Sequence, residues 1–336
     1  MQLFLDDSQH RERLFPFTHT RHTADIRIGI LTIREKWKFL TGYIIADNHH
    51  KSLVINSNIL PSKNNYTDIL ANKITNSKTL EYPWQIFQYN DWAIREDFKM
   101  LTEGRKSEPL SSTNKVIGIA DDIFIEEGAQ VEHSILNTVG GPIYIGKNAL
   151  IMEGNMIRGP FAICERAVLK MGSKVYGATT IGPFCTAGGE IKNSVLFGYS
   201  NKAHDGYLGD SVLGEWCNLG AGTSNSNVKN TGGEVKYTVN NAGDSLSAGN
   251  KAGLLMGDYS RAAINTSFNT GTVVGVCCNI FGENFPGKYI ANFSWGKDRY
   301  DLEKAFKDIS NWKKMKGQAI SEAEKTLLEH LYKSNQ

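Results

Sequence analysis

Aliphatic residues recur at every sixth position through the middle of this 336-residue chain. A step of six fits neither an amphipathic helix, with a period of about 3.6, nor a simple alternating strand. A parallel β-helix made of hexapeptide turns does give this step, because each hexad forms one short face of a three-sided coil. We therefore expect the following residues to point inward: Ile145, Ile151, Ile157, Ile163, Leu169, Val175, Ile181, Leu213, Leu219, Met256, Ala262, Phe268, Val274 and Ile280, with Ile119, Ile125 and Val131 in an earlier stretch.

Small residues and glycines accompany the aliphatic repeat. Residues four positions after an aliphatic one are mostly small, and we expect them near the corners, where bulk would clash; Asn155 and Phe161 break this rule. Glycine directly after several aliphatic residues eases the turn between faces. Chance alternation in a β-sandwich is the alternative, but the unbroken run from Ile145 to Ile181 argues against it. The small residues are Ala149, Ala167, Ser173, Thr179, Cys185, Ser260, Thr266, Thr272 and Cys278.

The phase of the repeat slips in three segments, residues 137–142, 187–202 and 228–253. We expect each segment to form a loop that leaves the coil. The last is rich in Asn, Gly and Ser, and we expect it to be flexible. Loops on a rigid scaffold often carry function. The first and last coils are expected to need caps, because each lacks a neighbour on one side.

The N-terminal third lacks the repeat. Residues 2–7 predict a short strand that ends in acids, and residues 51–61 predict a buried strand. Residues 25–37 and 89–102 carry helical patterns. With the polar linker at 104–115, these elements predict a small α/β region of the parallel-sheet type.

The C-terminal segment also changes character. Leu302, Ala305, Phe306 and Ile309 form a helical stripe. Ser321 followed by Glu324 predicts a capping box before a second helix that ends near Lys333. We expect these helices to cap the coil or to pack against its side. The expected units are residues 1–110, 111–296 and 297–336.

Composition narrows the class of protein. Lys and Arg number 37 and Asp and Glu 35, so the net charge is +2 and no strong field favours nucleic acid or a membrane surface. The five cysteines include no Cys-x-x-Cys pair, so neither a disulfide framework nor a thiolate zinc site is predicted. No apolar run reaches the length of a membrane span, and the first residues do not read as a secretory signal. We therefore expect a cytoplasmic protein without nucleic-acid binding or membrane insertion.

The stretch YLGDSVLGEWCNLGAGTSNSN, residues 207–227, resembles a known acyltransferase motif. It looks like the acyltransferase half of the bifunctional N-acetylglucosamine-1-phosphate uridylyltransferase/glucosamine-1-phosphate N-acetyltransferase family. That motif reads H-x-x-Y-L-G-D, then N-I-G-A-G-T, then an asparagine; here these are His204, residues 207–210 and 218–223, and Asn227. Over nearly the full chain, the sequence resembles a Bacteroidetes-type sugar nucleotidyltransferase variant, through segments such as TRHTADIRIGILTIREKW, YPWQIFQYNDWAIREDF and FNTGTVVG.

The resemblance implies a fold and an assembly. The fold is an α/β nucleotidyltransferase-like region followed by a left-handed parallel β-helix with C-terminal helices. The handedness comes from the resemblance alone, because parallel crossovers are nearly always right-handed. The assembly is a homotrimer whose active sites lie between neighbouring subunits.

The resemblance also implies a reaction, the transfer of an acetyl group from acetyl-CoA to the amine of an amino-sugar 1-phosphate such as glucosamine 1-phosphate. An ammonium cannot attack a thioester, so a base must take the proton of the amine, and histidine suits this task at neutral pH. His204 matches the base of the family. The alternative is a hydrogen-bonded loop histidine.

Further positions match the ligand contacts of the family. Tyr207 and Asn227 match residues that contact the sugar, and Asn218 matches another polar contact, with an asparagine ladder inside the coils as its alternative. Lys192 and Lys170 fall where the family has a lysine and an arginine for the sugar phosphate, and solvated lysines are the alternative. The backbone N–H groups of Gly220, Ala221 and Gly222 are expected to be open for coenzyme A or a developing oxyanion, although turn geometry also accounts for the glycines.

The N-terminal region departs from the nucleotidyltransferase pattern of the family. The glycine-rich phosphate loop is replaced by DDSQHRERLFPFTHTR, which has no glycine, and the lysine of the family falls near His22 or Thr23. Asn58 stands where an acid would bind the metal. Arg21 and Arg27 are candidates for nucleotide phosphate, or are exposed structural arginines. We hypothesise a degenerate or shortened domain, with Mg²⁺ as a cofactor only if this half is active and no other metal site.

Three hypotheses follow for the function. The first is an N-acetyltransferase in the synthesis of sugar-nucleotide and cell-envelope precursors. The second is a sugar-1-phosphate nucleotidyltransferase that makes a UDP- or dTDP-sugar, as the main or a second activity. The third is a non-catalytic trimeric scaffold. Carbonic anhydrases with hexapeptide repeats need three clustered zinc histidines, and this repeat contains His133 and His204 alone, so we reject that class.

Overall fold

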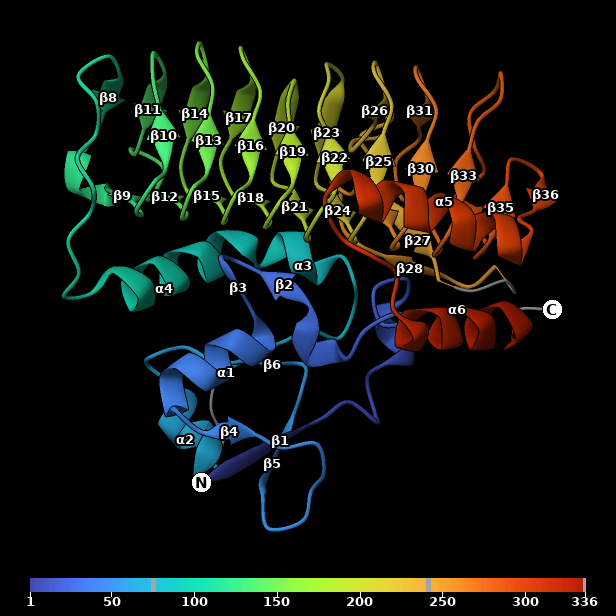
Figure 1. Cartoon of the computed structure of the whole chain (residues 1–336), viewed down its shortest axis with the longest axis horizontal. Coiled ribbons are helices and arrows are strands. Elements are labelled where there is room, and N and C mark those ends of the chain that lie inside the picture. The colour runs from blue at the N-terminus through green and yellow to red at the C-terminus, as the bar shows by residue number, and fades with distance from the viewer. Residues whose placement is uncertain (74–76, 240–242, 335–336) are drawn as a thin grey trace.

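A computed structural model of the chain describes residues 1–73, 77–239 and 243–334, and a three-sided coil of short parallel strands forms its upper layer (Figure 1). Each strand pairs with the strand one turn earlier, so three long sheets run along the coil. This is the parallel β-helix that the repeat predicts, of the left-handed type that the resemblance predicts.

We name the three faces of the coil by what covers them. The head-side face contains β9 (Ile123–Ile125), β12 (Ile143–Ile145), β15 (Phe161–Ile163), β18 (Thr179–Ile181), β21 (Val195–Leu196), β24 (Val212–Leu213), β29 (Leu254–Met256), β32 (Thr272–Val274) and β34 (Tyr289–Ile290). The tail-side face contains β10 (Gln130–Val131), β13 (Leu150–Ile151), β16 (Val168–Leu169), β19 (Thr186–Ala187), β22 (Asn201–Lys202), β25 (Asn218–Leu219), β30 (Arg261–Ala262), β33 (Asn279–Ile280), β35 (Ser294–Trp295) and β36 (Asp298–Arg299). The open face contains β8 (Lys115–Ile117), β11 (Ile135–Asn137), β14 (Met156–Arg158), β17 (Lys174–Tyr176), β20 (Glu190–Lys192) and β23 (Tyr207–Gly209), continued by β26 (Ser224–Asn225) and β31 (Ser267–Phe268).

The interior of the coil confirms the six-residue step. The aliphatic residues expected to point inward are buried in one continuous core, with the exception of Ile119. Ile119 is 63% exposed in the turn after β8, so its assignment was wrong. The small residues lie near the corners as predicted, because Ala149, Ala167 and Cys185 each stand directly before a strand, after the turn that precedes it. They also point into the core, beside the aliphatic residues.

The three phase slips have different outcomes. Residues 137–142 do leave the coil as a corner loop between β11 and β12. Residues 187–202 do not form a loop, since β19 to β22 continue the coil through shortened corners, and the loop prediction was wrong there. Residues 228–253 leave the coil as predicted, but they contain the antiparallel hairpin of β27 (Lys236–Thr238) and β28 (Ser245–Ser247), with Tyr237 fully buried. Residues 240–242 of this segment lie outside the described residues.

The N-terminal region, which we call the head, lies beneath the coil (Figure 1). Its sheet is parallel, as predicted, with β1 at the centre. Helices α3 and α4 lie between the coil and the rest of the head. The sheet strands are β1 (Gln2–Asp6), β4 (Ile44–Ile45) and β5 (Leu53–Asn56), the hairpins are β2 (Arg27–Ile28) with β3 (Leu31–Thr32) and β6 (Ile59–Leu60) with β7 (Lys78–Thr79), and the helices are α1 (Ile33–Thr41), α2 (Tyr66–Leu70), α3 (Gln85–Gln88) and α4 (Asn90–Thr102).

Two predictions for the head need correction. The helix expected over 25–37 begins only at Ile33, because the hairpin of β2 and β3 precedes it. The backbone N–H groups of Ile30 and Leu31 donate to the buried Asp97 carboxylate on α4, so tertiary hydrogen bonds hold this segment out of a helix. The strand expected over 51–61 exists as β5, but it lies at a sheet edge with Leu53 and Val54 exposed, so it is not buried.

The head is fixed to the head-side face of the coil. Asn90 Nδ2 donates to the carbonyl of Ala178 at 2.7 Å, and Thr180 Oγ1 donates to the carbonyl of Gly29 at 3.0 Å. Outward-facing apolar residues of the coil join the core of the head, including Val195, Phe197 and Val212. The head therefore covers one full side of the coil.

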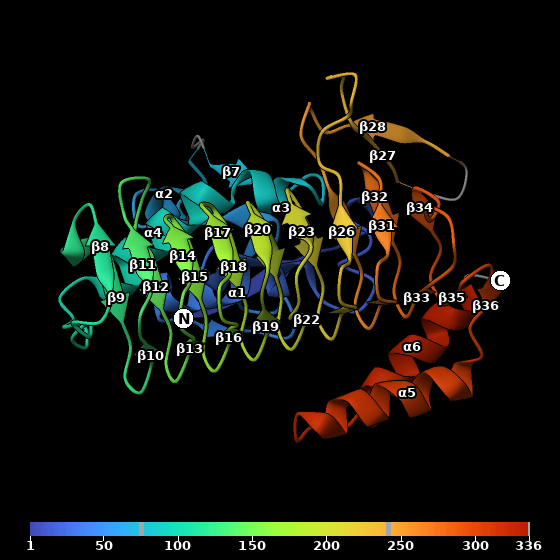
Figure 2. The same ribbon diagram turned by 90° about the horizontal axis from the view of Figure 1, so that it is seen from above.

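The C-terminal helices pack against the side of the coil. They are α5 (Leu302–Met315) and α6 (Glu322–Ser334), which lie beside its last turns (Figures 1 and 2). Ala305, Phe306 and Ile309 form one core with Trp216 and Tyr259 of the coil, as the helical stripe predicts. The predicted capping box is confirmed, because the backbone N–H of Ser321 donates to Glu324 and the backbone N–H of Glu324 donates to Ser321.

Acid is expected to weaken the attachment of the head through His19. Burial lowers the pKa of His19 from 6.5 to about 4, although its hydrogen bond with Asn292 of the coil acts in the opposite direction. The unfolded chain then binds this proton more readily than the folded chain. The stability that neutral His19 contributes is fully present above pH 6.5 and is lost as the pH falls towards 4, by about 2–3 kcal/mol.

Urea unfolding of the wild type and of His19→Asn at pH 7 and pH 4.5 measures this effect. The variant is expected to lose less stability than the wild type between the two pH values. Equal losses would rule out His19 as the titrating group.

Candidate active site

The predicted site residues gather around one edge of the coil, where the chain passes from the tail-side face to the open face. We call this edge the ridge; it consists of residues 132–134, 152–155, 170–173, 188–189, 203–206, 220–223 and 263–266. His204 lies on the ridge between β22 and β23, and its side chain is exposed. Among the described residues, no hydrogen-bond partner of its imidazole is found. An exposed ring without a partner is free to take a proton from a ligand.

A polar network lies on the open face and reaches from Tyr207, at the start of β23, to the corner that follows this strand. Asn227 Nδ2 donates to the Tyr207 hydroxyl at 3.1 Å and to Asp210 Oδ2 at 2.5 Å. Asn193 Nδ2 donates to the other oxygen of Asp210 at 2.6 Å. The Tyr207 ring lies over Gly209, where a Cβ atom would come within 2.2 Å of its hydroxyl oxygen. Tyr207 and Asn227, which the sequence predicts as sugar contacts, are therefore brought together around a buried carboxylate.

The ionisation of Tyr207 follows from this setting. Burial raises its pKa to about 12, and the charge of Asp210 acts in the same direction. Tyr207 is therefore protonated at neutral pH, and its hydroxyl can donate a hydrogen bond to a ligand oxygen.

The two predicted lysines lie on turns that precede the turn of His204. Lys192 on β20 pairs in register with Gly209 on β23, which places it on the same outer row as the Tyr207 hydroxyl. Lys170 lies on the ridge, with its Cβ 3.2 Å from where a Cβ of Gly188 would stand. Both are half-buried, and neither forms an ion pair with any residue in the described part of the chain.

Asn218 lies across the ridge from this network. It is on the tail-side face and points outward, since its neighbour Leu219 fills the interior. The asparagine ladder considered for the inside of the coil is therefore wrong at this position. Within one chain, Asn218 and Tyr207 lie on different faces.

The backbone at 220–222 is less open than the sequence suggests. The Gly220 N–H donates to the carbonyl of Ala262 at 2.9 Å, and the Gly222 N–H donates to the carbonyl of Asp205 at 3.0 Å. Both N–H groups donate hydrogen bonds within the coil, so the prediction that they are open to a ligand was wrong. The Ala221 N–H has no partner among the described residues. A Cβ at Gly222 would lie 2.1 Å from Asn265 Oδ1, so close packing of the next turn requires the glycine there.

The two arginines of the head that were predicted to bind phosphate already bind other groups of the protein. Arg21 is buried, forms an ion pair with Asp258 of the coil, and lies 4.8 Å above the ring of Phe197. Arg27 donates to the carbonyl of Ile30 and lies 3.5 Å from Glu35. Both arginines have the structural role that the sequence offered as the alternative, but neither is exposed.

The side chains of the head are poorly suited to bind a magnesium ion. Asn58, at the position expected for an acid, donates to the carbonyl of Leu80 and to Glu81, both at 3.2 Å. Asp7 forms an ion pair with Arg11, and its other carboxylate oxygen lies 3.5 Å from His22 Nε2. In the described ranges, no group of three or more His, Cys, Asp or Glu side chains is arranged to hold a metal. In the described residues, the head therefore contains no preassembled metal site made of protein ligands alone.

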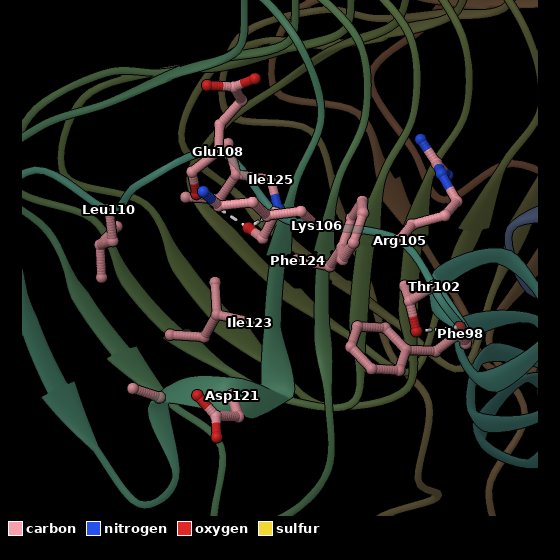
Figure 3. A pocket seen from close by; sticks show the side chains of 12 residues that line it. Phe98, Thr102, Arg105, Lys106, Glu108, Leu110, Asp121, Ile123, Phe124 and Ile125 are labelled. Carbon is pink, nitrogen blue, oxygen red and sulfur yellow. Dashed lines mark hydrogen bonds between the residues drawn. The ribbon is translucent and has the colours of Figure 1, made fainter.

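A cavity of the protein lies away from the predicted site residues. It has a volume of about 500 Å³ and lies between the end of α4, the linker and the first coil (Figure 3). Phe98, Asp121 and Phe124 line it, and Arg105 at its rim pairs with Glu126 at 2.6 Å. No predicted site residue lines this cavity. The ridge, by contrast, is an exposed corner, so a ligand there would need a second surface to enclose it.

Sequence reasoning missed three residues near His204. Asp210 closes the Y-L-G-D motif, and its acidic side chain after an outward-facing tyrosine is a usable signal. Asn193 lies at a corner with a positive φ of 45°, which asparagine tolerates, but the sequence alone does not connect it to Asp210. Lys202 lies six residues before Leu208, an interior position, and the phase slip concealed it.

Comparison with known proteins finds one family model and several curated relatives. The model of the sugar nucleotidyl transferase family matches residues 2–76. A bifunctional sugar-1-phosphate nucleotidylyltransferase/acetyltransferase of Sulfurisphaera tokodaii is 31% identical over 204 residues, which is 59% of this chain and 43% of the relative. The bifunctional protein GlmU of Methanocaldococcus jannaschii is 28% identical over 187 residues, 56% and 41% of the two chains. GlmU of Rubrobacter xylanophilus is 38% identical over 115 residues, 33% and 20% of the two chains.

The chain thus spans less than half the length of these curated relatives. The relatives and the family model agree with the resemblance carried by the motifs. Within the described residues, no helix is long and apolar enough to cross a membrane.

Proposed function

We propose that this chain, a relative of the bifunctional sugar-1-phosphate nucleotidylyltransferase/acetyltransferases, is an N-acetyltransferase that acts on an amino-sugar 1-phosphate. The acetyl donor would be acetyl-CoA, and the acceptor would resemble glucosamine 1-phosphate. The observation that carries the proposal is the exposed, unpartnered imidazole of His204 on the ridge, at the start of the strand whose Tyr207 joins a network with Asn227 and Asp210. The product would serve the synthesis of sugar nucleotides in the cytoplasm.

The reaction needs one base and one leaving thiolate. The amine nitrogen forms a bond to the acetyl carbon, and the bond from that carbon to sulfur breaks. His204 takes the proton that the amine loses, and this proton can then neutralise the thiolate that leaves. Acetyl-CoA supplies the activated acetyl group, and the protein supplies the base and the alignment of the amine.

The remaining polar residues would bind the sugar phosphate. The Asp210 carboxylate holds Asn227, and Asn227 donates to the Tyr207 hydroxyl, so these polar groups are oriented before a ligand arrives. Lys170 and Lys192 would neutralise the phosphate as point charges, without the paired contacts of an arginine. Asn218 faces away from this group, so it would contact a ligand held against another subunit. This arrangement supports a homotrimer with each site between two chains.

Coenzyme A would lie along the same ridge. The Ala221 N–H is available to a ligand carbonyl, and the glycines around it keep the corner free of side chains. The corner therefore offers coenzyme A one backbone N–H donor, whereas the sequence suggests three.

Separate binding measurements test the proposed function. Thermal denaturation is followed with acetyl-CoA, with glucosamine 1-phosphate and with UTP, each added alone. Acetyl-CoA and glucosamine 1-phosphate are each expected to raise the midpoint temperature of unfolding. At a ligand concentration of a hundred times the Kd, the bound ligand should stabilise the protein by about 2.7 kcal/mol. Absence of any effect from both would favour the non-catalytic scaffold.

The family-model match over residues 2–76 favours a second activity, the transfer of a nucleotidyl group to a sugar 1-phosphate. The head sheet is parallel, and its central strand β1 ends at Asp6, at the edge where such sheets bind ligands. Release of pyrophosphate from UTP or dTTP with a sugar 1-phosphate in Mg²⁺ would support this activity. The poor metal fit makes it the weaker candidate.

Substitution of Asn227 with alanine is expected to weaken sugar binding. The change removes a donor to the Tyr207 hydroxyl and leaves the Asp210 carboxylate with one hydrogen bond fewer. The expected result is a KM for the sugar phosphate about tenfold higher, equivalent to about 1.4 kcal/mol, with the KM for acetyl-CoA nearly unchanged. Asn137→Ala, on the same face at the far end of the coil, is the control. A similar rise in both variants would argue against a specific role for Asn227.

A further inference from the structure

Lys202 is a cation inside an apolar coil. It ends β22 at an inward-facing position, in register with Ala187 of the preceding turn, which belongs to the aliphatic core. Its side chain is 2% exposed. A buried charge is costly unless its donors are satisfied, so this lysine needs an explanation that the six-residue repeat does not give.

The ammonium of Lys202 binds two backbone carbonyls on the ridge. Nζ donates to the carbonyl of Gly188 at 2.9 Å and to the carbonyl of His204 at 2.6 Å. These carbonyls belong to the two successive ridge corners, residues 188–189 and 203–206, and the second corner carries the proposed base. Lys202 therefore connects both corners from the inside.

Other corners of the ridge are capped differently. A hydroxyl or amide side chain stands just before the open-face strand and donates to the carbonyl of a ridge residue. The pairs are Asn155 Nδ2 to Met152 at 2.6 Å, Ser173 Oγ to Lys170 at 2.7 Å, Thr223 Oγ1 to Ala263 at 3.0 Å and Thr266 Oγ1 to Ala263 at 2.8 Å.

The two corners next to Lys202 have glycine at this capping position. A Cβ at Gly189 would lie 2.8 Å from the carbonyl oxygen of His204 and 3.0 Å from Lys202 Nζ. A Cβ at Gly206 would lie 2.1 Å from the carbonyl oxygen of Thr223. Neither corner has room for a serine or threonine, so neither has a side-chain cap at this position.

We infer that Lys202 is a positioning residue for His204, which replaces the missing side-chain caps of these two corners and so holds the backbone of the His204 corner rigid. The inference rests on the proposed acetyl transfer at His204. Lys202 lies beneath the backbone and does not reach the outer surface, so it acts through the corner that it holds.

The charge of Lys202 is preserved at neutral pH. Burial lowers its pKa to about 8, while Asp205, the charged side chain found to influence it, acts in the opposite direction. The neighbouring interior residues, Ala187 and Leu219, are aliphatic. The ammonium is therefore mostly protonated near pH 7, and its donors remain directed at the two carbonyls.

Lys202→Met tests this role, because methionine has a similar length and suits an apolar column but cannot donate. We expect kcat for acetyl transfer to fall about 10- to 100-fold as the corner loses its fixed geometry. The KM values for both substrates should stay within about twofold. The melting temperature should change little, because removal of a buried charge offsets the loss of two hydrogen bonds to carbonyls. Ile151→Met, at an interior position of the same face, is the matched control and should leave all values unchanged.

Hydrogen exchange separates this inference from the proposed function. The amides of Glu190 and Gly222 donate to the carbonyls of Gly206 and Asp205 in the His204 corner, so they report on its rigidity. Their exchange should accelerate in Lys202→Met and not in Ile151→Met. An inactive wild-type protein would defeat the proposed function, while unchanged exchange would overturn the role of Lys202. A kcat within twofold of wild type, or a loss of activity that only follows a loss of stability, would also overturn it.

Discussion

Replacing His204 with alanine is expected to lower kcat for acetyl transfer by about 10²- to 10⁴-fold, the usual contribution of a general base. The imidazole is exposed and unpartnered, so its removal should leave the hydrogen bonds of the coil intact. The melting temperature and the KM for acetyl-CoA should therefore stay near their wild-type values. Release of the coenzyme A thiol, followed with a thiol reagent at saturating substrates, measures the effect.

His133→Ala provides a matched control for this experiment. His133 is exposed on the same ridge, at the corner after β10 near the far end of the coil. Removal of the His133 side chain should leave kcat unchanged. Added imidazole should restore part of the activity of His204→Ala and should not change the activity of His133→Ala. Turnover of His204→Ala above half of the wild-type value would remove the proposed base.

Asp258→Asn is expected to produce the largest loss of stability, about 3–5 kcal/mol. The Asp258 carboxylate accepts hydrogen bonds from Thr20, from Arg21 and from the backbone N–H of Glu215, and its side chain is 4% exposed. Burial alone would lower the pKa of Arg21, but the charges of Asp258 and Glu215 raise it overall. Neutralising Asp258 leaves the Arg21 guanidinium buried without its main partner. Urea unfolding at pH 7 measures the loss.

Glu103→Gln is the control for Asp258→Asn. Glu103 pairs with Lys63 on the surface of the head, with both side chains more than half exposed. Its loss should cost less than about 1 kcal/mol. If Asp258→Asn costs no more than Glu103→Gln, then the Arg21 ion pair does not fasten the head to the coil.

The Arg21 ion pair also bears on the second proposed activity. The loop after β1 is the segment that the resemblance assigns to phosphate binding. Here Phe17 packs 5.4 Å from the ring of Phe197, and Thr20 and Arg21 hold Asp258. The loop thus anchors the head to the coil, and a nucleotide could take these groups only by breaking the anchor.

The regular part of the coil could be predicted from the sequence, because one physical demand repeats at every sixth residue. Each interior position from Ile145 to Ile181 meets the same demand, so a count of residues identifies it. The shortened corner at 188–189 breaks the six-residue count. In the sequence, such a break looks the same whether the corner is shortened or the chain leaves the coil as a loop. Lys202 was overlooked for this reason, since its lysine identity suggests a surface while its register places it inside.

The predictions that failed depend on contacts between distant segments. The segment at 25–37 has a helical pattern, but Asp97, far along the chain, binds its backbone in another conformation. The amides of Gly220 and Gly222 look free in a glycine-rich turn, but carbonyls of neighbouring turns accept their hydrogen bonds. The motif predicts the grouping of Tyr207 and Asn227 well, because the two residues lie on adjacent turns of one face.

The most direct measurement of the central claim is a stoichiometric assay of the purified protein with acetyl-CoA and glucosamine 1-phosphate. The account predicts that one thiol is released for each N-acetylated sugar phosphate formed, in the absence of any nucleotide or added metal. Pyrophosphate release from UTP and a sugar 1-phosphate, with no acetylated sugar formed, would contradict it.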